Sequence, residues 1–391
     1  MASSDDQRAQ LSRREMLLAG GALAFGAAAG GGISLATTRL ADSDDPAPID
    51  PTGDHQAGIA RPATPQPYCL LGVLAVADTN RQAIADALES VSSVIRAFAG
   101  TDVVTPETPD GAGDISVTVG LGPRLVTAID ATLPAATAMP TFAGDQHIPE
   151  HRRDGDALIN VCSSNPAVLA PVMATLVAAW PGAAIAWQQL GFRGPGEGTV
   201  VRNPLGFHDG VIVPRGEAEL DENVWIADGP AAGGTVCVVR QLRLNVPEFI
   251  AEDVERQEAI IGRKRSDGAP LSGGGPMDEV DLRAKAPDGE LITPLRSHAR
   301  AAHPSFTGSK LMLRRGYAYV NGPAESDGVR VDDQGLLFVC FQRELDDFVK
   351  TQLRMDESDD LMDYATPVSS GSFLILPGMG RNQPLGASLV I

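Results

Sequence analysis

Apolar residues repeat along the first part of the chain with the periods of strands and helices. Residues 69–76 form an apolar run, and apolar and polar residues alternate over 115–119, as is typical of strands. The stretch between them carries apolar residues at helical spacing, namely Ile84, Leu88, Val91, Ile95 and Phe98. Three further runs predict a strand, a helix and a strand at 156–162, 167–179 and 184–188. This order of elements is typical of a ferredoxin-like α+β unit.

The same kind of pattern returns in the last part of the chain. The predicted elements are a strand at 235–242, a helix at 246–261, a strand at 336–341, a helix at 344–353 and a strand at 371–376. The apolar side of the first of these helices is expected at Phe249, Ile250, Val254 and Ile261. A Gly-, Pro- and Asp-rich insertion follows that helix up to about residue 296, and long loops in compact domains are usually functional. We therefore expect an α+β fold of two ferredoxin-like domains, at 68–202 and 203–391.

Residues 1–41 have the features of a targeting segment. They contain the twin-arginine signature Ser12-Arg13-Arg14-Glu15-Met16-Leu17, followed by a weakly apolar Ala/Gly-rich run. We expect cleavage near 36–41, export to the periplasm or the cell exterior, and no stable membrane insertion of the mature chain. Because this route carries proteins that are already folded, often around a cofactor, it favours a cofactor enzyme. Residues 42–67 are rich in Pro, Asp and Ala and indicate a linker or a meandering arm.

The composition limits the classes of partner. The 391 residues are 43% hydrophobic, which is enough for a large core, and the formal net charge of −19 at pH 7 argues against nucleic acid. The cysteines lie far apart in apolar segments, so their spacing offers no zinc site. We expect buried free thiols, although export leaves disulfides open, at Cys69, Cys162, Cys237 and Cys340.

The candidate chemistry begins with one acid in the middle of the chain. Asp209 is the next-to-last residue of the run Asn203-Pro204-Leu205-Gly206-Phe207-His208-Asp209-Gly210, whose glycines suit a tight turn. A lone Asp-Gly pair is more often an Asx-turn than a functional site. Further along, however, His and Arg residues gather in the short stretches 294–304 and 313–319. The presence of these His and Arg residues favours a functional role for Asp209 over a structural one.

Taken in order, these motifs resemble the dye-decolorising peroxidase family over nearly the whole mature chain. The shared stretches are His55-Gln56-Ala57-Gly58-Ile59, Gly206-Phe207-His208-Asp209-Gly210, Ser297-His298-Ala299-Arg300, Leu313-Arg314-Arg315-Gly316-Tyr317, Gly335-Leu336-Leu337-Phe338 and Leu376-Pro377-Gly378. The resemblance implies haem b as cofactor, bound in the second domain. It also implies hydrogen peroxide and an organic electron donor, such as a bulky dye or a phenol, as partners.

The resemblance assigns roles to particular residues. His298 is expected as the proximal iron ligand, Asp209 as the distal acid and base, and Arg314 as the distal arginine. Arg315 is the weaker candidate for that last role, because neighbouring strand residues face opposite ways. His303 is a rival iron ligand, although Pro304 favours a turn role for it.

Further residues complete the expected site. Phe338 is expected to wall the distal pocket, and Arg300 either to meet a haem propionate or to form a surface ion pair. The carboxylate that hydrogen-bonds the proximal His is left open among Asp356, Glu357, Asp359, Asp360 and Asp363. Electron transfer to a donor outside the pocket has three candidate relays, for each of which core packing is the competing role, namely Tyr317, Tyr319 and Trp225.

The expected reaction is a peroxidase cycle in which Asp209 moves the peroxide proton while Arg314 steadies the departing oxygen. Since an Asp serves as the base, we expect best turnover in mildly acidic solution. The alternative is an exported haem-binding or iron-release protein, similar to a deferrochelatase. A secreted α+β protein without a cofactor is the third hypothesis. The natural donor and any homo-oligomer are left open by the sequence.

Overall fold

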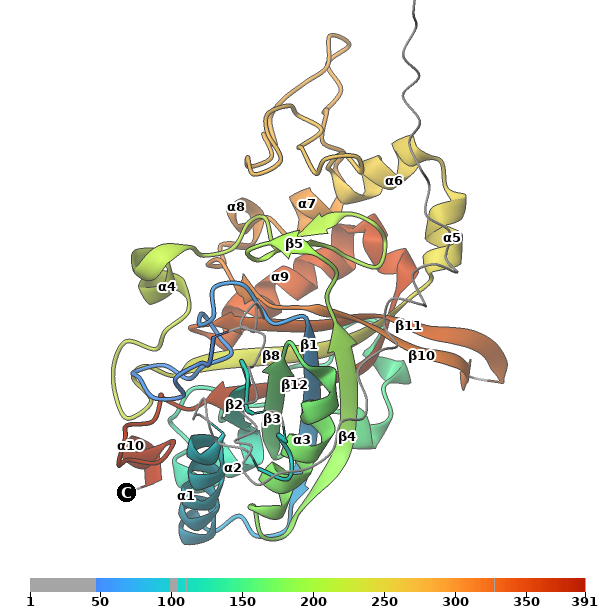
Figure 1. Ribbon diagram of the computed structural model, residues 1–391. Helices are drawn as coiled ribbons and strands as arrows, with labels where there is room; N and C mark the ends of the chain where they lie inside the picture. The colour runs from blue at the N-terminus through green and yellow to red at the C-terminus, as the bar shows by residue number, and fades with distance from the viewer. Residues whose placement is uncertain (1–46, 99–104, 110, 327, 391) are drawn as a thin grey trace, which may run out of the picture. The chain divides into compact units, whose positions relative to one another are not determined.

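The computed structural model describes residues 47–98, 105–109, 111–326 and 328–390 (Figure 1). The predicted signal segment at 1–41 lies outside these residues. Within the described ranges, no helix is long and apolar enough to cross a membrane. The described chain mixes helices with one large antiparallel sheet, to which both halves of the chain contribute strands.

The first half contains the strands and helices that its apolar pattern predicts, with small shifts at their ends. Its strands are antiparallel and adjacent in the order β4-β1-β3-β2. The elements are β1 (Tyr68–Val76), α1 (Arg81–Ala97), β2 (Ser116–Leu121), α2 (Pro123–Ile129), β3 (Ala157–Ser163), α3 (Leu169–Ala178) and β4 (Ala183–Phe192). A small three-stranded sheet follows, made of β5 (Gly196–Glu197), β6 (Val200–Arg202) and β7 (His208–Asp209).

The second half repeats this order of strands in space. Its strands run β12-β8-β11-β10, and β10 also pairs with β4, so the two halves share one hydrogen-bonded sheet. The strands are β8 (Thr235–Leu244), β9 (Leu313–Arg314), β10 (Tyr317–Ser326), β11 (Val329–Gln342) and β12 (Ala365–Ile375). The helices are α4 (Gly216–Asn223), α5 (Val246–Ala251), α6 (Val254–Ile261), α7 (His298–Ala301), α8 (Pro304–Thr307), α9 (Leu345–Ser358) and α10 (Ala387–Val390).

The prediction of one helix over 246–261 was wrong, because the chain forms two helices there. Asp253 adopts extended backbone and its side chain accepts a hydrogen bond from the Arg256 N–H, so it starts α6 as an N-cap. Of the four apolar positions expected on one face, Ile250 is 49% exposed and Val254 is 47% exposed. The apolar spacing fits a single helix, but the capping preference of the Asp breaks it.

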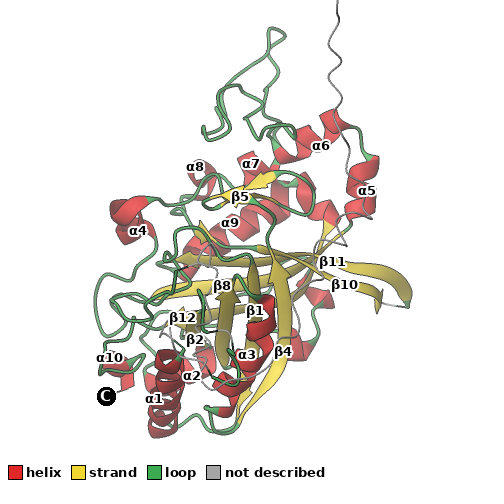
Figure 2. Cartoon of the chain, viewed as in Figure 1, coloured by secondary structure: helices red, strands yellow, loops and turns green. Residues whose placement is uncertain are grey.

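The sheet and helices enclose separate apolar layers. Helix α1 buries its apolar positions against the first-half sheet, and Asn80 caps its start by accepting from the Ala83 N–H. Figure 2 shows α1, α2 and α3 on one side of the strands and α6, α7, α8 and α9 on the other. A second apolar cluster lies between the strands of the two halves and contains Leu71, Val239 and Phe373. All four cysteines are buried free thiols on strands.

The segment predicted as a linker or arm packs on the large sheet. Gln56 is 3% exposed, and its amide nitrogen donates to the carbonyls of Val119 (2.8 Å) and Leu376 (2.9 Å). Gly58 has φ +89°, and a Cβ on it would lie 2.3 Å from the Thr118 hydroxyl oxygen. The motif at 55–59 therefore ties strands from the two halves together.

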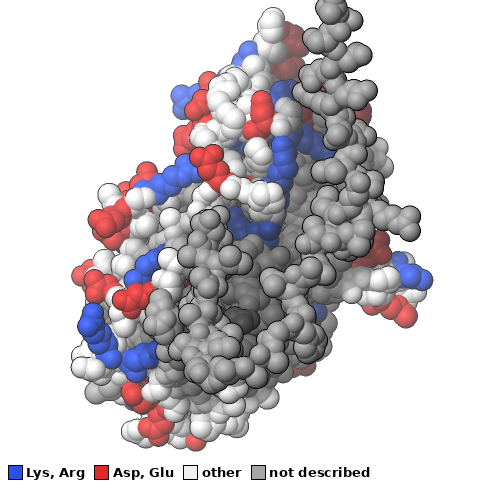
Figure 3. Space-filling view, viewed as in Figure 1, with Lys and Arg blue, Asp and Glu red and all other residues white. Residues whose placement is uncertain are grey.

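Charged side chains of both signs are interspersed over the described part of the face in Figure 3. One ion pair is buried instead, between Asp145 in the first half and Arg240 on β8. Its side chains are 6% and 2% exposed, with 2.5 Å between Oδ1 of Asp145 and Nη2 of Arg240. Arg240 also donates to the Ser370 hydroxyl at 3.1 Å.

We expect Asp145→Ala to lower the free energy of unfolding by roughly 3–5 kcal/mol, because it leaves the Arg240 charge buried without a partner. The measurement is urea unfolding. Asp346→Ala is the control, since Asp346 pairs with Lys350 on the surface of α9, with side chains 59% and 48% exposed. Its loss is expected to stay below about 1 kcal/mol. Equal losses for the two variants would contradict the assigned role of the buried pair.

Candidate active site

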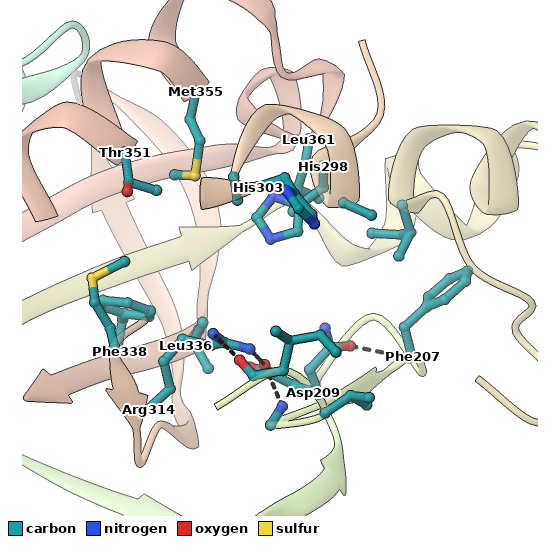
Figure 4. A pocket seen from close by; sticks show the side chains of 18 of the residues that line it. Phe207, Asp209, His298, His303, Arg314, Leu336, Phe338, Thr351, Met355 and Leu361 are labelled. Atoms are coloured by element: carbon teal, nitrogen blue, oxygen red, sulfur yellow. Dashed lines mark hydrogen bonds and ion pairs between the residues drawn. The ribbon is translucent and has the colours of Figure 1, made fainter. Parts of the chain in front are cut away.

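A cavity of about 230 Å³ lies between the second-half sheet and the helices above it (Figure 4). Strands β8 and β11 form one wall, α7 and α9 another, and the turn at 203–212 with β9 a third. Most of its lining is apolar, including Leu205, Phe207, Leu242, Leu336, Phe338 and Phe348. Such a lining suits a large apolar ligand held by a few polar groups.

The turn that carries Asp209 is closed by its own side chains. Asn203 accepts backbone hydrogen bonds from Leu205 and Phe207, both at 3.1 Å. Gly210 has φ +80°, and a Cβ on it would lie 2.2 Å from the Thr199 carbonyl oxygen. Only glycine fits there, which explains why a glycine follows the acid. The carboxylate of Asp209 accepts from the Gly210 N–H at 2.6 Å and is thereby aimed at the cavity.

Arg314 holds that carboxylate from β9. Its Nη2 lies 3.3 Å from Oδ1 of Asp209, and its Nη1 donates to the Ile212 carbonyl at 2.9 Å. The side chains of Asp209 and Arg314 keep 31% and 27% of their surfaces exposed, so both remain reachable. Burial raises the pKa of Asp209, but Arg314, the Gly210 N–H and His298 together lower it below the ordinary value. Asp209 is thus a carboxylate in neutral and mildly acidic solution.

His298 reaches the cavity from the opposite side, as the first residue of α7. Its Nδ1 lies 2.7 Å from Oδ2 of Asp359, whose side chain is fully buried, whereas the imidazole is 37% exposed. Burial lowers the pKa of His298, but Asp359, with help from Asp209, raises it above the ordinary value. Because the carboxylate occupies Nδ1, the free Nε2 is left for a ligand or a metal.

Asp359 is therefore the acid that supports the imidazole among the candidates left open by the sequence. It lies at the end of α9, where its second oxygen accepts from the Leu361 N–H at 2.9 Å. The neighbouring Asp360 pairs instead with Arg256 and Arg296. Asp356 accepts from the Ala143 N–H and from Gln352.

The two rival residues have other roles. His303 also lines the cavity, but its Nδ1 accepts from the Ser305 N–H at 3.1 Å, as expected of a turn residue. Arg315 is 4% exposed and donates to the carbonyls of Ile59 and Pro62, so it holds the arm. Of the two adjacent arginines, Arg314 alone lines the cavity.

The structure does not place Arg300 where the sequence analysis expected it. Arg300 is 5% exposed and donates to the carbonyls of Leu282, Thr293 and Pro294, away from the cavity lining. Among the described residues it forms neither an ion pair nor part of the cavity wall, because these carbonyls of the insertion use its donors. The motif at 297–300 thus joins one cavity residue to one residue that holds the loop.

Phe338 lines the cavity as expected, and α9 adds wall residues that the sequence analysis missed. Phe348, Thr351 and Met355 face the cavity at helical spacing. Phe348 and Thr351 fall within the helix predicted at 344–353, whereas Met355 lies beyond its predicted end. The pattern alone did not show which face meets a ligand. The relay candidates Tyr317, Tyr319 and Trp225 are 2%, 0% and 5% exposed and lie outside the cavity lining.

Comparison with known proteins identifies the class. The family model of the DyP-type peroxidase N-terminal part matches residues 56–193, and that of the C-terminal part matches residues 201–380. The chain belongs to the DyP-type peroxidase family and is an oxidoreductase that acts on peroxide.

Individual relatives cover nearly the whole chain. It is 32% identical to a dye-decolorizing peroxidase of Thermobifida fusca over all of both chains. It is 28% identical to a deferrochelatase of Yersinia pestis, covering 99% of this chain and 96% of that protein. Among solved structures, an oxyferrous complex of DtpA from Streptomyces lividans has 30% identity and a TM-score of 0.80, covering 89% and 98%. A DyP-type peroxidase from Cellulomonas bogoriensis has 31% identity and a TM-score of 0.80, covering 88% and 99%.

The residues around the cavity fit the haem that this family binds. An imidazole nitrogen, oriented by a buried carboxylate, faces the cavity from one side, and Asp209 with Arg314 faces it from the other (Figure 4). The apolar walls between them suit the faces of a flat macrocycle. This donor set offers one imidazole nitrogen on one side of the cavity and one carboxylate-guanidinium pair on the other.

We expect Asp359→Ala to weaken haem binding by roughly 10- to 100-fold, because the imidazole of His298 loses the carboxylate that orients it. The measurement is the rate of haem transfer to apomyoglobin. Asp360→Ala is the matched control, since the neighbouring acid pairs with surface arginines instead. If both variants release haem at the wild-type rate, Asp359 does not support the ligand.

Proposed function

We propose that this protein is a haem b-dependent peroxidase in which Asp209 and Arg314 act on peroxide opposite the iron ligand His298. The observation that carries the proposal is the placement of two polar pairs across one apolar cavity. One pair is His298 with Asp359 at 2.7 Å, and the other is Asp209 with Arg314 at 3.3 Å. Both pairs keep their functional atoms open to the cavity.

The proximal pair holds the cofactor. Nε2 of His298 would bind the iron. Asp359 would accept a hydrogen bond from the Nδ1–H and make the imidazole a stronger electron donor to the iron. The apolar side chain of Phe338 walls the cavity and excludes water from it. When bound, haem supplies the iron that accepts one peroxide oxygen and the electrons of the donor.

The distal pair moves the proton. The overall reaction reduces hydrogen peroxide with two electrons and two protons to two waters. In the proposed reaction a proton must pass from the peroxide oxygen nearer the iron to the oxygen that departs as water. Asp209 accepts it because its lowered pKa keeps the carboxylate ionised. Arg314 then stabilises negative charge on the departing oxygen.

The electron donors we propose are bulky dyes and phenols. This rests on the similarity to a dye-decolorizing peroxidase, whose name describes its substrates. Haem would occupy the cavity, so the electrons of a large dye would enter from the protein surface.

The finer features of fold and location belong to the same proposal. The strand orders β4-β1-β3-β2 and β12-β8-β11-β10 support two ferredoxin-like domains, at 68–202 and 203–391. The signature around Arg13 and Arg14 supports export by the twin-arginine route, to the periplasm or beyond the cell.

A second candidate function is iron release from haem. The similarity to deferrochelatases over nearly the full chain favours it. The same His298 would then hold the porphyrin while the iron leaves. This function needs no proton acceptor for peroxide, so the distal pair separates the two candidates.

We expect the haem-loaded protein to bleach an anthraquinone dye with peroxide, and Asp209→Asn to slow the bleaching by roughly 10²- to 10⁴-fold while keeping the Soret band. The measurement is stopped-flow absorbance. Asp130→Asn, on an exposed turn, is the matched control. Porphyrin fluorescence that grows without peroxide, together with no bleaching by the wild-type protein, would favour iron release instead. Unchanged bleaching in Asp209→Asn would show that another group accepts the proton.

We expect kcat/KM for peroxide to hold in mildly acidic solution and to fall only as the pH drops through the lowered pKa of Asp209. Arg314→Leu removes a neighbour that lowers this pKa and leaves the burial that raises it. The acid limb, the part of the pH profile where kcat/KM falls toward low pH, should therefore move to higher pH. Brief pH jumps in a stopped-flow instrument measure the limb. An acid limb unmoved in Arg314→Leu would show that another group titrates.

A further inference from the structure

Arg193 reaches from the first half of the chain to the distal wall. It directly follows β4, and its backbone N–H donates to the Pro67 carbonyl at 2.8 Å. Its guanidinium donates to two other carbonyls, from Nη1 to Gly316 in the second half at 2.9 Å and from Nη2 to Thr199 at 2.8 Å. The guanidinium also lies over the ring of Tyr317, 5.6 Å from the centroid. One half-buried side chain is thus held on three sides.

Each of the two carbonyls lies in a backbone segment that holds one distal residue, Asp209 in one case and Arg314 in the other. Thr199 pairs closely with the residue after Asp209, because its hydroxyl donates to the Gly210 carbonyl at 2.9 Å. The Thr199 carbonyl oxygen is also the atom that a Cβ at Gly210 would strike. Gly316 follows Arg314 by two residues, between β9 and β10. The guanidinium of Arg193 therefore links the backbone segment next to Asp209 with the backbone segment next to Arg314.

The distal pair needs such a bridge. Its 3.3 Å contact is longer than the 2.7–2.9 Å or so of a strong charge-assisted hydrogen bond, so a small displacement would break it. Asp209 and Arg314 also come from segments more than a hundred residues apart, joined at this point by few direct contacts.

The charge of Arg193 acts in the same direction. Burial lowers the pKa of Arg193, and Tyr317 and Asp209 oppose that shift. Asp209 thus interacts electrostatically with Arg193 as well as with Arg314 and His298. The other groups around Arg193 are the thiols of Cys69 and Cys162 and the guanidinium of Arg315.

We propose that Arg193 is a positioning residue that fixes Asp209 relative to Arg314 through the carbonyls of Thr199 and Gly316. This inference rests on the proposed function, because it assigns to the first half of the chain a role in the distal chemistry. Arg193 lies outside the cavity lining. A lysine would keep the charge but would not span both carbonyls, since only the guanidinium has a planar fork of donors.

The test compares Arg193→Gln and Arg193→Lys with Arg343→Gln in the haem-loaded protein. Arg343 is a matched control, because its half-buried guanidinium also bridges two backbone carbonyls, those of Trp225 and Asp221, outside the cavity lining. We expect Arg193→Gln to lower kcat/KM for peroxide by roughly 10- to 100-fold, with KM for the dye unchanged. Its acid limb should also move to higher pH.

The conservative variant separates geometry from charge. Arg193→Lys should keep the acid limb near its wild-type position and recover only part of the rate. Thr199→Val, which removes the hydroxyl bond to Gly210 and keeps the shape, should lower the rate in the same direction by a smaller factor. It decides the question if the Arg193 variants do not fold.

Three outcomes overturn the proposal. The first is Arg193→Gln with wild-type rate and acid limb at full haem content. The second is an equal loss in Arg343→Gln, and the third is an unchanged rate in Thr199→Val when neither Arg193 variant folds. A wild-type protein that binds haem without turning over peroxide would instead overturn the proposed function, so the two failures are distinguishable.

Discussion

The contact between the carboxylate of Asp209 and the guanidinium of Arg314 is the constraint on which the rest of the site depends. A carboxylate enclosed by apolar walls tends to take up a proton, and a protonated Asp209 has no capacity to accept one from peroxide. The nearby guanidinium and the Gly210 N–H reverse that tendency. The glycine after the acid is required for the same reason, because a side chain there would strike the Thr199 carbonyl and turn the carboxylate away.

Both halves of the fold contribute to keeping this contact opposite His298. The second half provides the cavity itself, with β8 and β11 as its floor and α9 as the element that brings Asp359 behind the imidazole. The first half contributes no strand to the cavity wall, yet it fastens the distal side through Arg193 and the arm through Arg315. The buried pair of Asp145 and Arg240 adds a third link between the halves. The site is therefore a product of the whole described chain.

The sequence predicts those parts of the structure that depend on local periodicity or on a motif. The helix at 81–97 follows from apolar residues every three or four positions, and the Asp209 turn follows from its glycines. The sequence does not predict contacts that depend on a partner far along the chain. Five acids near the end of α9 look equivalent in sequence, and only the packing of α9 against α7 brings Asp359 to the imidazole. Arg300 shares a motif with His298, but the carbonyls of the insertion take its donors.

The central claim is that His298 and Asp209 face each other across one bound haem. A crystal structure of the haem-loaded protein tests it most directly. The account predicts iron bonded to Nε2 of His298, with the carboxylate of Asp209 and the guanidinium of Arg314 above the opposite face of the porphyrin. Iron bonded to another side chain, or Asp209 on the same face as His298, would contradict it.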